Sequence, residues 1–130
     1  MAAYLSFNGN CKEAMVFYQH CIGGELTYQM VGASPDSGNL PRQMKDCVLE
    51  ATLSKENVLL KGTDLVDDMV ARGNSMTILI ECRDQDEMKS YFKNLAVGGR
   101  EILPPAAGFF GGLHAMLTDR FGFQWLLRST

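Results

Sequence analysis

The chain has 130 residues, of which 46% are hydrophobic and 21% charged, and its formal net charge at pH 7 is -3. These values are typical of one folded domain with a hydrophobic core, and they exclude an intrinsically disordered chain. The sequence shows no run of Lys or Arg, no secretory leader and no apolar stretch approaching the roughly 20 residues of a membrane span, so we expect neither nucleic acid nor a membrane as partner.

The first predicted helix spans residues 10–22 and follows a strand-like run at 4–8. Asn10 is a good N-cap residue, and Glu13, three residues later, can complete a capping box. Apolar residues recur at helical spacing, and Gly23-Gly24 ends the helix. The pattern predicts a helix with one apolar face against a core.

Three further strands are predicted in the first half of the chain, at 25–31, 47–53 and 58–61. They are runs of apolar and β-branched residues between turn-forming residues. The loop at 32–46 contains prolines and glycines.

The second half repeats this order. A helix is predicted at 84–96, where Asp84 takes the place of Asn10 and Glu87 the place of Glu13. The accompanying strands are predicted at 76–82, 100–103, 113–118 and 123–128. Each half therefore reads β-α-β-β-β, although the pattern alone also fits a ferredoxin-like α+β sandwich. We expect one domain, with module one at 1–62, a connector at 63–73 and module two at 74–130.

Three local motifs make the repeat more specific. They are YLSFNGNCKEAMVFY at 4–18, GGEL at 23–26 and LTDRFGFQW at 117–125. Together with the repeat, they resemble the PhnB-like branch of the vicinal-oxygen-chelate superfamily, which includes glyoxalases, bleomycin-resistance proteins and ring-cleaving dioxygenases. The resemblance implies an α+β fold in which two βαβββ modules form a half-barrel around a cleft.

The same resemblance bears on metals. Metal enzymes of the superfamily carry His, Glu or Gln ligands on the first and last strands of each module. The matching positions here fall near Tyr4 or Leu5, Leu60 or Lys61, residues 75–77, and Leu126, and none is His, Asp or Glu. Because a divalent-metal site needs about three such side chains, we predict no bound metal and no cofactor.

Strand alternation within the implied fold predicts which side chains face the cleft. The predicted ligand-binding residues are Tyr4, Ser6, Glu50 and Thr52 in the first module and Thr77, His114, Met116, Gln124 and Leu126 in the second.

Two of these residues are candidate catalytic groups. Glu50 lies in the apolar sequence CVLEATL, where it can be a general base with a raised pKa or simply a solvent-facing acid on a half-exposed strand. His114 follows a glycine-containing stretch and can be a proton carrier, a lone metal ligand, or an ordinary hydrogen-bonded histidine.

Three functions remain open from the sequence. The leading hypothesis is a module that binds a small organic molecule without the usual metal site. The first alternative is a divalent-metal-dependent or acid-base lyase, isomerase or dioxygenase of the same superfamily, and the second is a protein that acts mainly through dimerisation.

The sequence also leads to expectations about the cellular location of the protein and about its oligomeric state. The cysteines, Cys11, Cys21, Cys47 and Cys82, show no C-x-x-C spacing, so we expect reduced thiols and a cytoplasmic location. We expect a homodimer, because members of the superfamily commonly pair and because Phe109 and Phe110 look like a contact surface. The alternative is that these two aromatic residues form a lid over the chain's own cleft.

Overall fold

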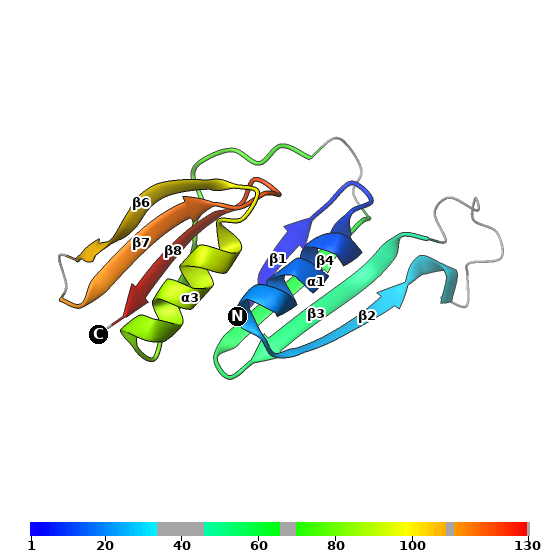
Figure 1. Cartoon of the computed structure of the whole chain (residues 1–130). Coiled ribbons are helices and arrows are strands. Elements are labelled where there is room, and N and C mark those ends of the chain that lie inside the picture. The colour runs from blue at the N-terminus through cyan, green and yellow to red at the C-terminus, as the bar shows by residue number, and fades with distance from the viewer. Residues whose placement is uncertain (34–45, 66–69, 109–110, 130) are drawn as a thin grey trace. The chain divides into compact units, whose positions relative to one another are not determined.

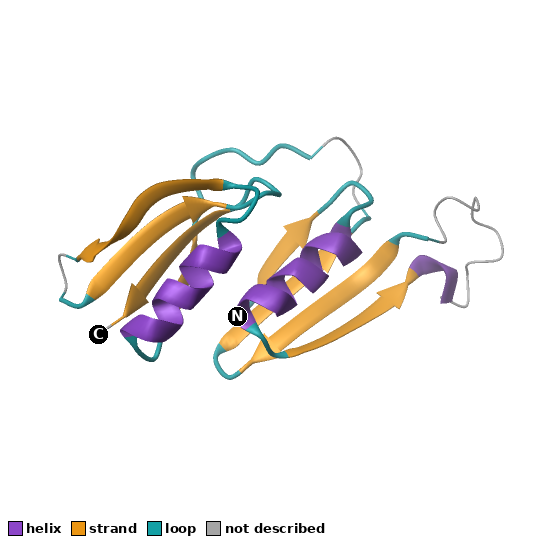
Figure 2. Cartoon of the chain, viewed as in Figure 1, coloured by secondary structure: helices purple, strands orange, loops and turns teal. Residues whose placement is uncertain are grey.

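The structure is a computed structural model, and it describes residues 1–33, 46–65, 70–108 and 111–129. In chain order the elements are β1 (Ala3–Ser6), α1 (Cys11–Ile22), β2 (Glu25–Met30), a 3-10 helix (Val31–Ala33), β3 (Val48–Lys55), β4 (Val58–Thr63), β5 (Ile78–Glu81), α3 (Gln85–Leu95), β6 (Arg100–Ala107), β7 (Leu113–Thr118) and β8 (Gln124–Ser129) (Figures 1 and 2). Phe109 and Phe110, on which the expected contact surface depends, lie outside the described residues.

The chain divides into two compact units, Met1–Ala71 and Arg72–Thr130. Each unit has one four-stranded sheet, ordered β1-β4-β3-β2 in the first unit and β5-β8-β7-β6 in the second. In both sheets the first strand of the unit pairs in parallel with the last, and the remaining pairs are antiparallel. The predicted α+β architecture of two βαβββ modules is therefore confirmed, and the ferredoxin-like alternative is wrong, because that fold has a single sheet.

In the first unit, α1 lies across one face of the sheet (Figure 1). Its side chains Met15 and Tyr18 are fully buried, as are Phe7 and Leu53, which come from the sheet side. Gly62 of β4 lets the helix approach closely, since a Cβ there would lie 3.0 Å from the Cys11 Sγ atom. The core of this unit is thus the layer between α1 and one face of the sheet.

The second unit is built in the same way, with α3 packed on β7 and β8. Trp125 and Leu127 of β8 are fully buried, and the Trp125 indole donates a 2.8 Å hydrogen bond to the buried Asp119 carboxylate. The other oxygen of Asp119 accepts from the backbone N–H groups of Phe121 and Phe123 in the β7–β8 turn. This accounts for the LTDRFGFQW motif as a turn held by one aspartate.

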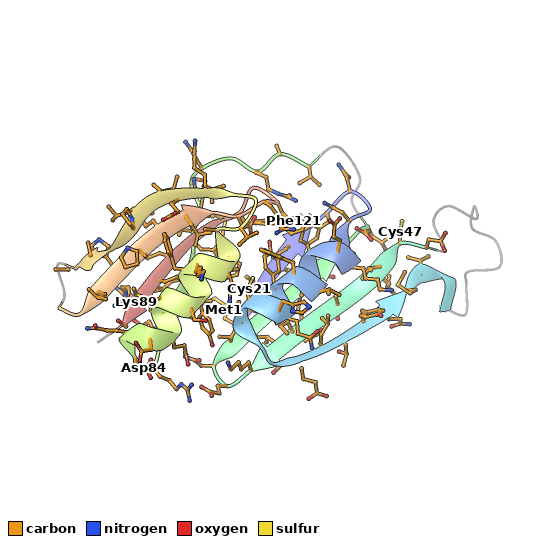
Figure 3. The ribbon with its side chains drawn as sticks, viewed as in Figure 1. Met1, Cys21, Cys47, Asp84, Lys89 and Phe121 are labelled. Atoms are coloured by element: carbon orange, nitrogen blue, oxygen red, sulfur yellow. The ribbon has the colours of Figure 1, made fainter. Side chains whose placement is uncertain are left out.

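The two helices begin differently. Asp84 caps α3 as predicted, since its carboxylate accepts from the Glu87 N–H at 2.8 Å (Figure 3). The prediction that Asn10 caps α1 is wrong, because its side chain makes no capping hydrogen bond. Asp64 replaces it from beyond β4: its buried carboxylate accepts from the N–H groups of Gly9 at 2.9 Å and Cys11 at 3.0 Å. A residue far along the chain therefore holds the start of this helix.

The predicted pair Gly23-Gly24 ends α1, whereas α3 ends at Leu95 with Ala96 as its C-cap, two residues before the pair Gly98-Gly99. One glycine in each pair also allows close packing. A Cβ at Gly24 would lie 2.7 Å from the Ser54 carbonyl oxygen, and one at Gly99 would lie 2.2 Å from the Thr118 carbonyl oxygen. Real Cβ atoms do not approach backbone so closely, so both positions require glycine. In each module the chain leaving the helix passes directly against the hairpin.

Strand boundaries differ from prediction by a few residues, most at β6. That strand continues through Pro104 and Pro105 to Ala107, past the predicted end at residue 103. It is an edge strand with register irregularities, and prolines are tolerated in such a strand. In the described parts of the chain, no helix is long and apolar enough to cross a membrane.

Candidate functional site

Within each unit the helix covers one face of the sheet, and the strand register identifies the residues on the opposite face, here called the open face. In the first unit Lys61 of β4 lies between Tyr4 of β1 and Thr52 of β3. Ser6 pairs with Thr63 along the same two strands, and Glu50 lies on β3 two residues before Thr52. The predicted residues Tyr4, Ser6, Glu50 and Thr52 therefore share the open face of one sheet.

The open face of the second unit has a central apolar row. Leu126 of β8 lies between Leu79 of β5 and Met116 of β7, and Met116 pairs in turn with Leu103 of β6. Charged residues flank this row on one side, where Arg128 lies between Glu81 and His114.

Polar residues flank it on the other side. Gln124 pairs with Thr118 in the β7–β8 ladder. Thr77 precedes β5, and its hydroxyl donates to the Gln124 side-chain oxygen at 3.4 Å. The five residues predicted for the second module, Thr77, His114, Met116, Gln124 and Leu126, are thus brought together on one sheet.

Comparison of the two ladders shows that the two candidate catalytic residues occupy equivalent positions. The pair Tyr4–Lys61 in the first unit corresponds to Leu79–Leu126 in the second. Lys61 pairs with Thr52, and Leu126 pairs with Met116. Glu50 lies two residues before Thr52 on β3, and His114 lies two residues before Met116 on β7. The two residues therefore occupy the same position of the repeat, although one is a carboxylic acid and the other an imidazole.

The open face of the first unit carries a polar cluster of Tyr4, Glu50 and Lys61. The Lys61 ammonium lies 3.4 Å from a Glu50 carboxylate oxygen, with 32% and 44% of the two side chains exposed. The Tyr4 phenol hydrogen-bonds the same carboxylate and also interacts with the Thr63 hydroxyl. Glu50 is therefore a half-exposed, partnered acid rather than an isolated buried one.

This environment changes the acidity of the phenol. Partial desolvation of the hydroxyl, reinforced by the hydrogen bond and negative charge of Glu50, raises the pKa of Tyr4 above its ordinary value. The Thr63 hydroxyl opposes this effect. Tyr4 is consequently a protonated hydrogen-bond donor at neutral pH.

The equivalent cluster of the second unit is arranged around Arg128. Its guanidinium donates to the Glu81 carboxylate at 2.5 Å, as a direct ion pair. His114 lies beside it in the ladder, close to Gly108, where a Cβ would come within 2.7 Å of the imidazole Nδ1 atom. Gly108 thus leaves the space that the imidazole occupies.

Reasoning from sequence missed two basic residues of these faces, Lys61 and Arg128. The sequence identifies Lys61 only as a position that does not match a metal ligand, and Arg128 only as the end of a strand. The alternation of side chains along β4 and β8 could have identified them, because Lys61 pairs with the predicted residue Tyr4 and Arg128 pairs with the predicted residue His114.

The residues present do not fit the divalent metal of the superfamily's enzymes. At the positions where those enzymes carry ligands, the ladders place Tyr4 beside Lys61. In the second unit Leu79, rather than one of the residues 75–77 expected from the sequence, lies beside Leu126. An ammonium group repels a metal cation, and leucine offers no donor atom. Across the described residues, no three His, Cys, Asp or Glu side chains gather in a group that could hold a metal.

Comparison with known proteins identifies the family. Residues 1–128 match the family model described as 3-demethylubiquinone-9 3-methyltransferase. Protein YjdN of Escherichia coli (strain K12) is 29% identical over 138 residues, which cover 98% of this chain and 92% of YjdN.

Comparison with solved structures finds the same fold over nearly the whole chain. The crystal structure of protein PA1353 from Pseudomonas aeruginosa superposes with a TM-score of 0.86 at 30% identity, covering 99% of this chain and 96% of PA1353. A putative 3-demethylubiquinone-9 3-methyltransferase, PhnB protein, from Bacillus cereus gives a TM-score of 0.77 at 22% identity, covering 100% of this chain and 98% of that one, which shows the shared fold. With the two βαβββ modules and the motifs that carry the resemblance, these matches show that the chain belongs to the PhnB-like branch of the glyoxalase, bleomycin-resistance and dioxygenase superfamily.

Proposed function

We propose that the chain binds a small organic molecule on the open faces of its sheets, without a divalent metal at the superfamily's usual positions. The observation that carries this proposal is the cluster of Tyr4, Glu50 and Lys61, in which Tyr4 and Lys61 occupy positions that match metal-ligand positions of related enzymes. A few convergent polar groups beside apolar surface are typical of sites for small molecules. The open face of the second unit has both kinds of surface by itself, since polar and charged residues flank its apolar row.

Each open face is a separate candidate surface, and the two offer different chemistry. The first offers an ammonium, a carboxylate, a phenol and the hydroxyl groups of Ser6 and Thr52, which can bind polar atoms. The second offers the apolar row of Leu79, Leu126 and Met116, which can bind a hydrocarbon part.

The methyl transfer named in the family description is not supported by the residues of this chain. A nucleotide-like methyl donor is commonly bound by a glycine-rich turn between a strand and a helix. Here the β1–α1 turn contains one glycine, Gly9, and the N–H groups of Gly9 and Cys11 already donate to Asp64. We therefore propose no step that uses such a donor.

An acid-base enzyme is the second candidate, and the Tyr4–Glu50 hydrogen bond favours it. A phenol and a carboxylate that lie together beside an ammonium can exchange a proton with a bound substrate. Lyase or isomerase chemistry would need no metal in that case. Loss of turnover in Glu50→Gln, with ligand binding retained, would distinguish this enzyme from a simple binding protein.

Metal content tests the proposal against the metal-dependent alternative. We expect protein purified without chelators to contain well below one equivalent of Zn, Ni, Fe or Mn, and its melting temperature to be unchanged by EDTA. An equimolar metal that is lost from Glu50→Ala or His114→Ala would contradict the proposal and would locate the site. Asp86→Ala, an exposed acid on α3, is the matched control.

We also propose a homodimer in the cytoplasm. The described edge strand β2 has mostly exposed residues and no proline, so a second chain can shield it. None of the four cysteines is in a disulfide, which supports a reducing compartment. Sedimentation at micromolar concentration tests the assembly: a single species near 14.4 kDa would rule out the dimer.

A further inference from the structure

We propose that the open face of the first unit recognises small organic carboxylates. Lys61 and Tyr4 bind the carboxylate group of the ligand, and the carboxylate of Glu50 pairs with Lys61 when no ligand is present. This inference rests on the proposed function and names the class of ligand. It concerns residues within a single unit and needs no contribution from the other.

Charge on the open face is the first reason. Among the described residues at open-face positions of β1 to β4, Lys61 is the one basic side chain, and it lies on β4 between Tyr4 and Thr52. A single ammonium beside two hydroxyl donors matches a group with one negative charge and two oxygen atoms. A dianion would suffer more repulsion from Glu50, so we expect inorganic phosphate to bind more weakly than a monocarboxylate.

The geometry of the ion pair is the second reason. The Lys61–Glu50 distance is 3.4 Å, whereas Arg83–Glu87 is 2.7 Å and Arg128–Glu81 is 2.5 Å. Charge-assisted hydrogen bonds between such groups are about 2.7–2.9 Å long, and half-exposed pairs contribute little stability. An ammonium has three N–H donors, so Lys61 can bind a second carboxylate without losing a strong bond.

The phenol is the third reason. Tyr4 hydrogen-bonds Glu50, and its pKa is raised by desolvation and by that carboxylate, so the hydroxyl keeps its proton at neutral pH. The group therefore already donates to a carboxylate oxygen in the absence of ligand. A ligand carboxylate beside Lys61 would present an oxygen of the same kind to the same donor.

The proposal makes opposite predictions for the two members of the ion pair. Lys61→Met keeps the length of the side chain and removes the charge, so carboxylate affinity should fall by at least about tenfold, while Lys61→Arg should retain binding. Glu50→Gln removes the internal competitor and its repulsion, so affinity should rise about three- to tenfold. Lys89→Met, an exposed lysine on α3, is the matched control and should not change binding (Figure 3).

Titration followed by NMR provides the test. Acetate, pyruvate and benzoate are added to the full chain, with acetamide and benzamide as neutral counterparts and inorganic phosphate as the dianionic probe. We expect the carboxylates to shift the Lys61 amide and the Thr52 methyl resonances, and the neutral amides to shift them much less.

The outcomes separate this inference from the proposed function. If benzamide shifts these resonances as strongly as benzoate, or if Lys61→Met binds benzoate as the wild type does, the carboxylate site is wrong although a small-molecule site remains. If no probe shifts an open-face resonance of either unit, both proposals fail. A folded spectrum of Lys61→Met shows that any lost binding reflects the missing charge.

Discussion

The start of α1 depends on Asp64, and replacing this residue gives a sharp test of the structure. The carboxylate is buried and accepts three backbone hydrogen bonds, from Gly9 at 2.9 Å, Cys11 at 3.0 Å and Val48 at 2.8 Å. It therefore joins the helix start to the beginning of β3. Asp64→Ala would leave these backbone donors without their acceptor inside the protein.

The expected cost follows from the number and type of these bonds. A hydrogen bond to a charged group contributes about 1.5–3 kcal/mol, and bonds that share one carboxylate do not add fully. We therefore expect Asp64→Ala to lower the free energy of unfolding by about 3–5 kcal/mol. Since about 1 kcal/mol corresponds to roughly 2–5 °C at this chain length, the melting temperature should fall by about 10–20 °C.

Three companion variants make the comparison specific. Asn10→Ala should cost less than about 0.5 kcal/mol, because its side chain makes no capping bond. Asp84→Ala should cost about 1 kcal/mol, because Asp84 does cap α3. The exposed Asp46→Ala is the control for the loss of an aspartate. Urea unfolding gives all four values, and a larger loss for Asn10→Ala than for Asp64→Ala would refute this account of the helix start.

Two further predictions concern packing and pH. Gly99→Ala should destabilise the protein more than Gly9→Ala, because the added Cβ would lie 2.2 Å from the Thr118 carbonyl oxygen in the first case. At Gly9 the added Cβ meets nothing within 4 Å, and the cost is limited to the strain of a side chain at a φ of 99°. Equal melting temperatures would contradict this. Burial, with a smaller effect of nearby carboxylates, raises the pKa of the Cys11 and Cys82 thiols from 9.0 to about 12. The folded state therefore favours the protonated thiols. Their contribution to the free energy of unfolding is present below about pH 9, and it should be lost as pH rises from about 9 toward 12. Changing both cysteines to Ala should flatten this slope, and an unchanged slope would assign the effect to other groups.

Local patterns in the sequence predicted those parts of the fold that depend on neighbouring residues. The predictions of the α3 cap at Asp84 and of the end of α1 at Gly23 are correct because the partners of these residues lie within a few positions. The Asn10 cap was wrong because Asp64, which is distant in the sequence, competes successfully for the same helix end. Nothing in a local pattern indicates that choice.

The candidate site could be predicted in part for a similar reason. Strand alternation correctly grouped Glu50 with Thr52 and His114 with Met116 on their strands. It could not show that Lys61 lies 3.4 Å from Glu50, because that contact depends on the register between β3 and β4. From the sequence Glu50 is either a general base or a solvent-facing acid on a half-exposed strand, whereas the structure shows a half-exposed acid with two partners, Lys61 and Tyr4.

The central claim is that the open faces bind a small organic molecule without a metal, and methyl NMR on EDTA-treated protein tests it most directly. A mixture of small organic fragments should shift the methyl resonances of Thr52, Met116 and Leu126, which lie on open faces, and leave those of the core residues Leu53 and Leu117 in place. Shifts confined to the core or helix residues, or shifts that occur only after a divalent metal is added, would contradict the claim.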